Sequence, residues 1–296
     1  MKTTMYFTLQ VDCEALQHSI RDPRLGERAI RGLGQISAET KIKITFQVIP
    51  ADLKAHARIY RELQSMGHEI GLHIHPADQG YEEFLGVCSF DEQARIIREA
   101  MDVFAQHMGR VAESFTPGYG SANDHTFPLL ESLGLRHGLV SIPTRNLPQC
   151  ACVWGSSSMD AHYPHRNNRC RAGDVDFVDI PATIDPESRM WGGAHPQDLR
   201  AELVDAKNHW YTIHKSVQQQ LNAGAKVPVK YLKAVTHNTF DYADKRNFRR
   251  ETLRGIIAAA QSICKAQDCR WAPATSADIA AEYRRRVPLP KVAPPL

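Results

Sequence analysis

Short apolar runs alternate along the chain with stretches in which apolar residues recur at helical spacing. The runs predict β-strands at residues 6–11, 43–49, 69–73, 114–116, 137–141, 175–180, 229–236 and 270–272. The helical spacing predicts α-helices at residues 25–40, 51–66, 91–108, 124–133, 196–223, 244–266 and 276–285. Strands that alternate with helices indicate a largely parallel sheet. We therefore expect an α/β fold, an incomplete or distorted (β/α)7 barrel, rather than an open doubly wound sheet.

One segment breaks this alternation. Residues 143–174 have little periodicity and are rich in Gly, Pro, Ser and Asn, so we expect a long loop excursion over one end of the barrel. The last residues, 287–296, are rich in proline and predict an extended tail. Residues 1–286 are then expected to form a single barrel domain.

Composition narrows the class of protein. The 296 residues are 43% hydrophobic and 23% charged, and the net charge of +3 is too small to argue for nucleic-acid binding. No apolar stretch approaches the roughly 20 residues that span a bilayer, and the first residues lack a secretory signal, so no membrane insertion is expected. The odd number of cysteines, 7, at irregular spacing predicts free thiols and a cytoplasmic location. The oligomeric state, including a homo-oligomer, is left open.

Two pairs of polar residues follow predicted strands at the same spacing. His73 and His75 stand at the end of the third strand, and Asp12 and Glu14 stand after the first. Residues i and i+2 of an extended segment project to the same face, so each pair can converge on one point. Two imidazole nitrogens and one carboxylate oxygen leave open positions on a metal ion, which is typical of a catalytic site.

Further polar residues lie at corresponding positions on other strands. Thr116 and Pro117 end the fourth predicted strand, and His237 follows the strand at 229–236. In βα barrels the active site is built at the carboxyl ends of the strands. The sequence therefore predicts one active site assembled from several strand ends.

The segment Gly67-His68-Glu69-Ile70-Gly71-Leu72-His73 resembles the second motif of the NodB-homology polysaccharide deacetylases, carbohydrate esterase family four. Residues 7–14, 115–120 and 235–238 are similar to the first, third and last motifs of that family. The resemblance runs, in order and spacing, over most of the chain. It implies an incomplete (β/α)7 barrel that removes N-acyl groups, usually acetyl, from amino sugars with one divalent metal ion.

The resemblance also implies roles for single residues. Asp12 corresponds to the catalytic base, and His237 to the histidine that protonates the leaving amine. Glu14, His73 and His75 correspond to the metal ligands, a set that suits Zn²⁺, with Co, Ni, Mn or Fe as alternatives. The expected substrate-binding residues are Thr116, Pro117, Tyr119, Trp191 and His195. Tyr119 and Trp191 offer apolar platforms for a sugar ring.

Three positions depart from the common family pattern. The usual position of the second ligand histidine, four residues after the first, holds Ala77, so that His75 must replace it. The carboxylate ligand is Glu14 where Asp is common, and Thr116 stands where the third motif usually carries an arginine that orients the base. These departures favour a divergent subfamily over enzymes that act on chitin-type polymers.

The leading hypothesis is a metal-dependent hydrolase that removes an acetyl or formyl group from an amino sugar or glycan precursor. One alternative is a hydrolase of a non-sugar amide or cyclic ureide, and another is a non-catalytic sugar-binding module on the same scaffold. Retention of Asp12 together with the ligand set argues against the binding module, because such a module needs no base.

Overall fold

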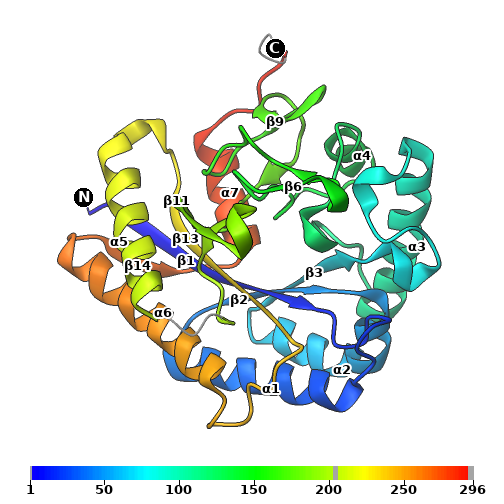
Figure 1. Cartoon of the computed structure of the whole chain (residues 1–296), viewed down its shortest axis with the longest axis horizontal. Helices are drawn as coiled ribbons and strands as arrows, with labels where there is room; N and C mark the ends of the chain where they lie inside the picture. The colour runs from blue at the N-terminus through cyan, green and yellow to red at the C-terminus, as the bar shows by residue number, and fades with distance from the viewer. Residues whose placement is uncertain (1, 203–205, 293–296) are drawn as a thin grey trace.

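The computed structural model describes residues 2–202 and 206–292 (Figure 1). Its centre is an eight-stranded sheet with the order β10-β5-β4-β3-β2-β1-β13, in which β14 also pairs with β1. The strands are β1 (Thr4–Cys13), β2 (Ile44–Val48), β3 (Glu69–Ile74), β4 (Ser114–Pro117), β5 (His137–Gly138), β10 (Val178–Asp179), β13 (Lys230–His237) and β14 (Arg270–Pro273). All eight predicted strands are thus present, although β5 and β10 are shorter than expected.

Every pair of neighbouring strands in this sheet is parallel. Among the described strands, no ladder joins the outer strands β10 and β13. The gap is bridged instead by Thr183, whose N–H donates to the carbonyl of Lys233 at 3.0 Å and whose hydroxyl accepts from the Lys233 N–H at 2.9 Å. The curled sheet therefore forms an incomplete barrel, as the sequence predicts.

The helices lie around the outside of the sheet (Figure 1). They are α1 (Pro23–Thr40), α2 (Pro50–Ser65), α3 (Phe90–Met108), α4 (Thr126–Ser132), α5 (Ala206–Ala223), α6 (Phe248–Ala266) and α7 (Ser276–Arg286). Short 3-10 helices are η1 (Pro76–Gln79), η2 (Leu85–Val87), η3 (Gly118–Gly120), η4 (Pro148–Cys150), η5 (Trp191–Gly193) and η6 (Gly224–Lys226). No helix in the described ranges has both the length and the apolar character needed to cross a bilayer.

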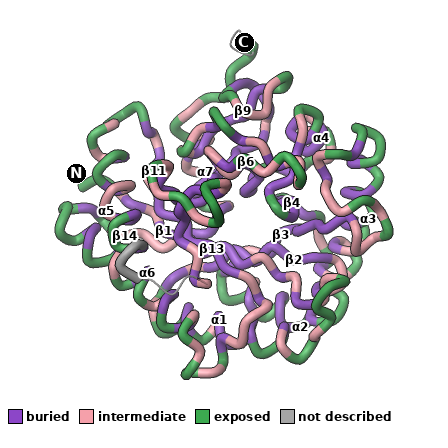
Figure 2. Tube along the Cα trace, in the orientation of Figure 1, coloured by how far each residue is buried: buried purple, intermediate pink, exposed green. Residues whose placement is uncertain are grey.

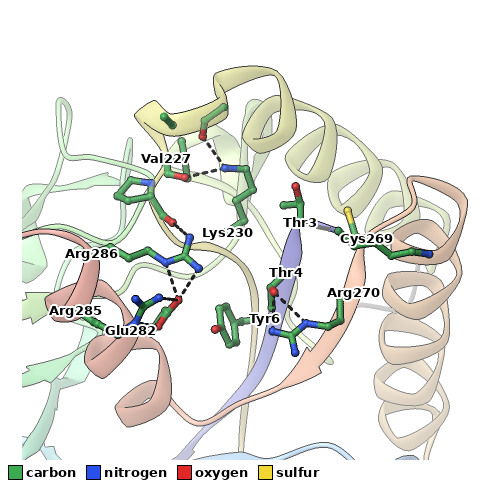
Figure 3. Close-up of a pocket in the computed structure, with 14 residues that line it drawn as sticks. Thr3, Thr4, Tyr6, Val227, Lys230, Cys269, Arg270, Glu282, Arg285 and Arg286 are labelled. Carbon is green, nitrogen blue, oxygen red and sulfur yellow. Dashed lines mark hydrogen bonds and ion pairs between the residues drawn. The ribbon is translucent and has the colours of Figure 1, made fainter.

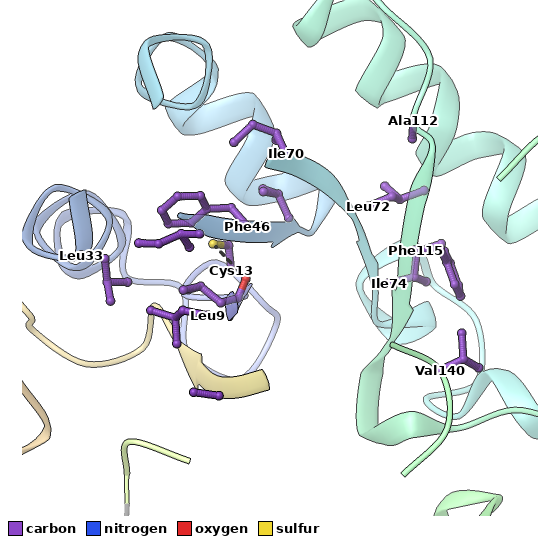
Figure 4. Close-up of a cluster of buried hydrophobic side chains, with 14 of the residues drawn as sticks. Leu9, Cys13, Leu33, Phe46, Ile70, Leu72, Ile74, Ala112, Phe115 and Val140 are labelled. Carbon is purple, nitrogen blue, oxygen red and sulfur yellow. Dashed lines mark hydrogen bonds between the residues drawn. The ribbon is translucent and has the colours of Figure 1, made fainter. Parts of the chain in front are cut away.

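The outer face of the sheet is apolar. Leu9, Phe46 and Leu72 alternate with polar residues along their strands and are fully buried. Figure 4 shows Leu9 and Phe46 beside Leu33 of α1. Burial of this kind contributes about 1.5–3 kcal/mol for each large side chain, and it fixes which face of each strand points toward the helices.

The inner face of the sheet is polar and equally buried. Figure 2 shows most of the trace of the central strands in the colour of buried residues. The amide of Gln10 in β1 donates to the hydroxyl of Thr116 in β4 at 3.3 Å, although two strands separate β1 from β4 in the sheet. Gln47 in β2 likewise donates to Ser114 in β4 at 3.2 Å. Such bonds can only span the concave side, so the curl of the sheet is stabilised by polar contacts across the barrel interior.

Two parts of the chain differ from the prediction. Residues 143–174 contain two short hairpins, β6 (Asn146–Leu147) with β7 (Cys152–Val153) and β8 (Pro164–His165) with β9 (Asn168–Ala172). The predicted helix at 196–223 was wrong in its first part, because β12 (His195–Asp198) pairs antiparallel with β11 (Ile184–Met190). Cross-strand pairing outweighs helical spacing there. In the predicted tail, residues 287–292 have no helix or strand, and residues 293–296 lie outside the described ranges.

A buried hydrogen-bonded pair, Glu69 and His137, lies at the amino-terminal end of the barrel. The Glu69 carboxylate accepts from His137 at 2.6 Å and from the Ala277 N–H at 2.8 Å. Burial opposes ionisation of Glu69, but His137 and these donors outweigh it and lower the pKa of Glu69 to about 2.

We predict that Glu69→Gln lowers the free energy of unfolding by about 3 kcal/mol at neutral pH, measured by urea denaturation. The pKa is depressed in the folded state, so the stabilisation is present above the unfolded value of about 4.3 and is lost as pH falls toward the folded value. The difference between parent and variant should therefore shrink below about pH 4. Glu113→Gln, at an exposed position, is the control; equal urea midpoints for Glu69→Gln and the parent would contradict the prediction.

Candidate metal centre

Three predicted ligand side chains meet at the carboxyl ends of β1 and β3. The Glu14 Oε2 atom lies 2.8 Å from His75 Nε2 and 3.4 Å from His73 Nε2. One ligand atom from each residue lies within 4.8 Å of the others, and no other such group of His, Cys, Asp or Glu occurs in residues 2–202 and 206–292. The i, i+2 spacing therefore brings both histidines to one point, as predicted.

The other ring nitrogens of the two histidines have acceptors. His73 Nδ1 lies 2.9 Å from the carbonyl oxygen of Thr116, and His75 Nδ1 lies 2.9 Å from the carboxylate of Glu83. Because these partners accept, each Nδ1 is the donor to its partner, and Nε2 is then the ring atom that faces Glu14 and is available to a metal ion. Hydrogen bonds of this kind orient metal-binding imidazoles and raise their basicity.

The charges in this cluster fit a cation. Burial opposes ionisation of Glu14, but His237, His73 and His75 hold its pKa well below the usual range. Burial also opposes protonation of His75, yet Glu14 and Glu83 raise its pKa to about 10. Glu14 and Glu83 thus favour positive charge at His75, and two imidazole nitrogens with one carboxylate are a donor set that suits a divalent ion such as Zn²⁺.

The position of Glu14 depends on Asn238, which follows β13. The Asn238 side-chain oxygen accepts from the N–H groups of Glu14 at 2.6 Å and Ala15 at 2.9 Å. Its amide donates to Asp52 at 2.9 Å, and Asp52 in turn accepts from the N–H of Leu16. The turn after β1 is therefore held by side chains from two other elements.

The predicted base and acid lie beside the ligand cluster. Asp12 and His237 are paired positions on the neighbouring strands β1 and β13. Gln10 donates to Asp12 at 2.8 Å, and His237 Nδ1 donates to Glu202 at 2.9 Å. Burial disfavours the charged form of His237, but Glu14 and Glu202 raise its pKa to about 9. His237 is therefore positioned to hold a proton at neutral pH.

These groups open into one cleft of about 300 Å³. Of the residues predicted from sequence, the cleft is lined by Asp12, Glu14, His73, His75, Thr116, Pro117, Tyr119, Trp191 and His237. His195 does not line it. That side chain is fully buried, with its ring edge-to-face against Trp191 at 4.8 Å, and its Nδ1 donates to the Pro196 carbonyl. Its burial argues against the predicted direct contact with substrate.

The third-motif segment packs directly against the ligand histidines. Tyr119 has a φ of 61°, and its ring contacts the His75 ring at 5.2 Å. A Cβ atom at Gly118 would come within 2.6 Å of the same ring, so this position requires glycine. Thr116 contributes a carbonyl to His73 and a hydroxyl to Gln10, the two contacts described above, and thus positions a ligand rather than replacing an arginine.

A larger cavity, of about 1270 Å³, lies at the opposite end of the barrel, where β1, β13 and β14 begin (Figure 3). Its basic side chains are engaged locally: Arg286 with Glu282, Lys230 with the Val227 carbonyl, and Arg270 with Thr4. None of the predicted site residues lines it. The smaller cleft is therefore the one that combines space with reactive groups.

Several site residues were missed in the sequence. Glu83 follows the histidine pair within Tyr81-Glu82-Glu83-Phe84, which reads as a solvated loop. Glu202 and Arg200 fell inside the predicted helix 196–223, and Arg145 lay in the segment without periodicity. Only the surplus of charged residues next to a candidate metal site could have indicated Glu83.

A family model described as polysaccharide deacetylase matches residues 28–138. The predicted resemblance to this family is confirmed. The matched segment includes β2–β5, His73, His75 and Thr116, but not Asp12, Glu14 or His237. No curated protein matches the chain.

Solved structures share the fold at low sequence identity. A proposed polysaccharide deacetylase from Mycobacterium smegmatis is 17% identical, with 100% of this chain and 96% of that chain covered and a TM-score of 0.61. A protein from Pseudomonas aeruginosa PAO1 assigned to the same class is 14% identical, with coverage of 97% and 93% and a TM-score of 0.63. PuuE allantoinase is also 14% identical, with coverage of 97% and 91% and a TM-score of 0.63.

We predict that the purified protein binds about one equivalent of a divalent ion and that a Glu14→Ala/His73→Ala/His75→Ala variant does not. Elemental mass spectrometry after dialysis against Zn²⁺ measures this. His18→Ala, which removes an exposed histidine, should leave the metal content unchanged. A parent protein that stays metal-free after loading would contradict the prediction.

Glu83 and Glu82 form a matched pair, since only Glu83 contacts a ligand histidine and Glu82 is exposed. Glu83→Gln should weaken zinc affinity roughly 10- to 100-fold, because the second hydrogen bond of His75 loses its charge. Glu82→Gln should not. Competition with a chromogenic chelator gives both affinities, and equal values for the two variants would show that Glu83 does not support the site.

Proposed function

We propose that this protein is a metal-dependent hydrolase that removes an acetyl or formyl group from the nitrogen of an amino sugar or glycan precursor. The observation that carries the proposal is the convergence of Glu14, His73 and His75 with Asp12 and His237 in one cleft. The match to the polysaccharide deacetylase family model supports it. A binding module would need neither a base nor a proton donor beside the ligand set.

Glu14, His73 and His75 would hold one divalent ion, which would acidify water and polarise the acyl carbonyl when bound. Asp12, oriented by Gln10, accepts the proton of the attacking water. His237, kept protonated by Glu202, gives a proton to the leaving amine nitrogen. Trp191 is 56% exposed at the rim, and with Tyr119, Thr116 and Pro117 it forms the surface on which the sugar binds.

We further propose that residues 1–286 act as one catalytic unit, that the substrate is a small molecule or glycan, and that the reaction is cytoplasmic. The polar barrel interior and the arrangement of β1–β14 around one cleft support the first point. The free cysteines support the last.

A second candidate is hydrolysis of a non-sugar amide or cyclic ureide. It is favoured by the small volume of the cleft, about 300 Å³, and it would use the same base, acid and ligand residues. Assays of N-acetylglucosamine and allantoin, run side by side, separate the two candidates.

We predict that Asp12→Asn and His237→Gln each lower kcat roughly 10²- to 10⁴-fold without loss of bound metal. Release of acetate from N-acetylglucosamine or its oligomers, beside metal analysis, measures both properties. His125→Gln, at an exposed position, is the control and should keep the parental rate. Parental activity in Asp12→Asn would remove Asp12 from the mechanism, and a metal-loaded parent inactive on every N-acyl substrate would overturn the proposed function.

A further inference from the structure

The cleft is also lined by a buried arginine, Arg145, that makes no ion pair with an acidic side chain in the described part of the chain. Arg145 lines the cleft and is 8% exposed. One of its terminal nitrogens donates to the carbonyl of Tyr119 at 2.7 Å, while its Nε is buried and makes no hydrogen bond in the described part of the chain. A buried guanidinium without a counter-charge is costly, so its presence beside an open cleft requires an explanation.

The neighbouring charges compensate Arg145 only in part, because Asp198 favours its charged form whereas Arg200 opposes it. Arg200 lines the same cleft, but it pairs with Asp198 through Nε at 3.0 Å and Nη2 at 2.8 Å. Burial lowers the pKa of Arg145, and the positive charge of Arg200 lowers it further. Burial also lowers the pKa of His195 to about 4, to which both arginines contribute, so His195 is neutral. Asp198 is hydrogen-bonded to Arg200, so Arg145 itself makes no ion pair among the described residues.

The arginine is held by the backbone around it. The Arg145 N–H donates to Ile142 and its carbonyl accepts from Trp154, at 3.0 and 2.9 Å. The next residue, Asn146, donates to the carbonyl of Ala194 in the β11–β12 hairpin at 3.0 Å. A charged group fixed in this way loses little freedom when it binds a ligand.

Its position suits a second group on the substrate of the candidate metal centre. Arg145 contacts Tyr119, and the Tyr119 ring contacts His75. The guanidinium of Arg200 lies over the Trp191 ring at 5.1 Å, and both residues line the same cleft. An acyl group at the ligand cluster and a charged substituent at Arg145 can thus belong to one sugar.

We propose that the cleft selects an N-acylated amino sugar bearing an oxyanion, a carboxylate or a phosphate monoester, which Arg145 binds. The N-acyl group in this inference rests on the proposed function, whereas the binding of the anion by Arg145 does not depend on it. Guanidinium groups bind both kinds of oxyanion through paired N–H donors. The anion would supply the counter-charge that Arg145 lacks in the protein alone.

Isothermal titration calorimetry tests the binding of anionic sugars. The protein is first treated with a chelator, so that the anions cannot bind to a metal ion. The probes are N-acetylglucosamine, its 1-phosphate and 6-phosphate, and N-acetylmuramic acid, which carries a carboxylate. At least one anionic sugar should bind roughly 10-fold or more tightly than the neutral sugar. The phosphate and carboxylate arms identify the source of the oxyanion.

Arg145→Gln should lower the affinity for the anionic sugar roughly 10- to 100-fold and leave the affinity for the neutral sugar nearly unchanged. Arg171→Gln, which removes an exposed arginine from β9, is the matched control and should retain the parental preference. If Arg145→Gln does not fold, Arg145→Lys replaces it in the test. Lysine keeps the charge but loses the planar pair of donors, so the preference for anionic over neutral sugars should be smaller than in the parent.

Three results would overturn the inference. The protein could bind neutral and anionic sugars with equal affinity, or it could bind no anionic sugar. In the third, Arg145→Gln lowers the affinity for neutral and anionic sugars alike. The last result would show that Arg145 only supports Tyr119. The proposed function fails separately, if the metal-loaded protein binds an anionic sugar but releases no acetate or formate from any N-acyl substrate.

Discussion

The candidate metal centre depends on the turn after β1, because Glu14 meets the two histidines only if that turn adopts one conformation. The histidines are fixed by strand geometry, since His73 lies in β3 and His75 directly follows it. Glu14 lies beyond the end of β1 and has no such support. The side chain of Asn238 supplies it by accepting two backbone N–H groups of the turn, and Asp52 secures the amide from α2. One buried amide thus connects three segments that are distant in sequence.

The sequence was sufficient for features with a local cause. Short apolar runs were enough to predict β1 and β3, and the i, i+2 rule correctly brings His73 and His75 together. Parallel topology then places Asp12 and His237 at the same end of the sheet. Strands β5 and β10 are short, so their apolar runs gave only approximate boundaries. The helix predicted to start at residue 196 was wrong at its beginning, because pairing of β12 with β11 is a nonlocal interaction that helical spacing cannot reveal.

Charge compensation was the least predictable property. Glu202 and Arg200 looked like residues of one helix, whereas the structure directs Glu202 to His237 and Arg200 to Asp198. Arg145 could not be predicted as a site residue, since it stands in a segment without periodicity. Only the folded structure shows that it lines the cleft without an ion-pair partner among the described residues. Which charges are paired is decided by tertiary approach, and sequence spacing carries that information only inside regular elements.

The placement of β14 has a consequence for how the chain is made. The amino-terminal half of β1 pairs with β14 on one side and with β13 on the other, at residues such as Met5, Trp271 and Lys230. During synthesis, β1 is made well before β13 and β14, so this half of β1 acquires its neighbours only after both of those strands have been made. Until then its backbone groups and apolar side chains are open to other partners. Contacts so distant in sequence slow folding and expose nascent chains to aggregation, so the barrel can be completed only after β13 and β14 have been synthesised.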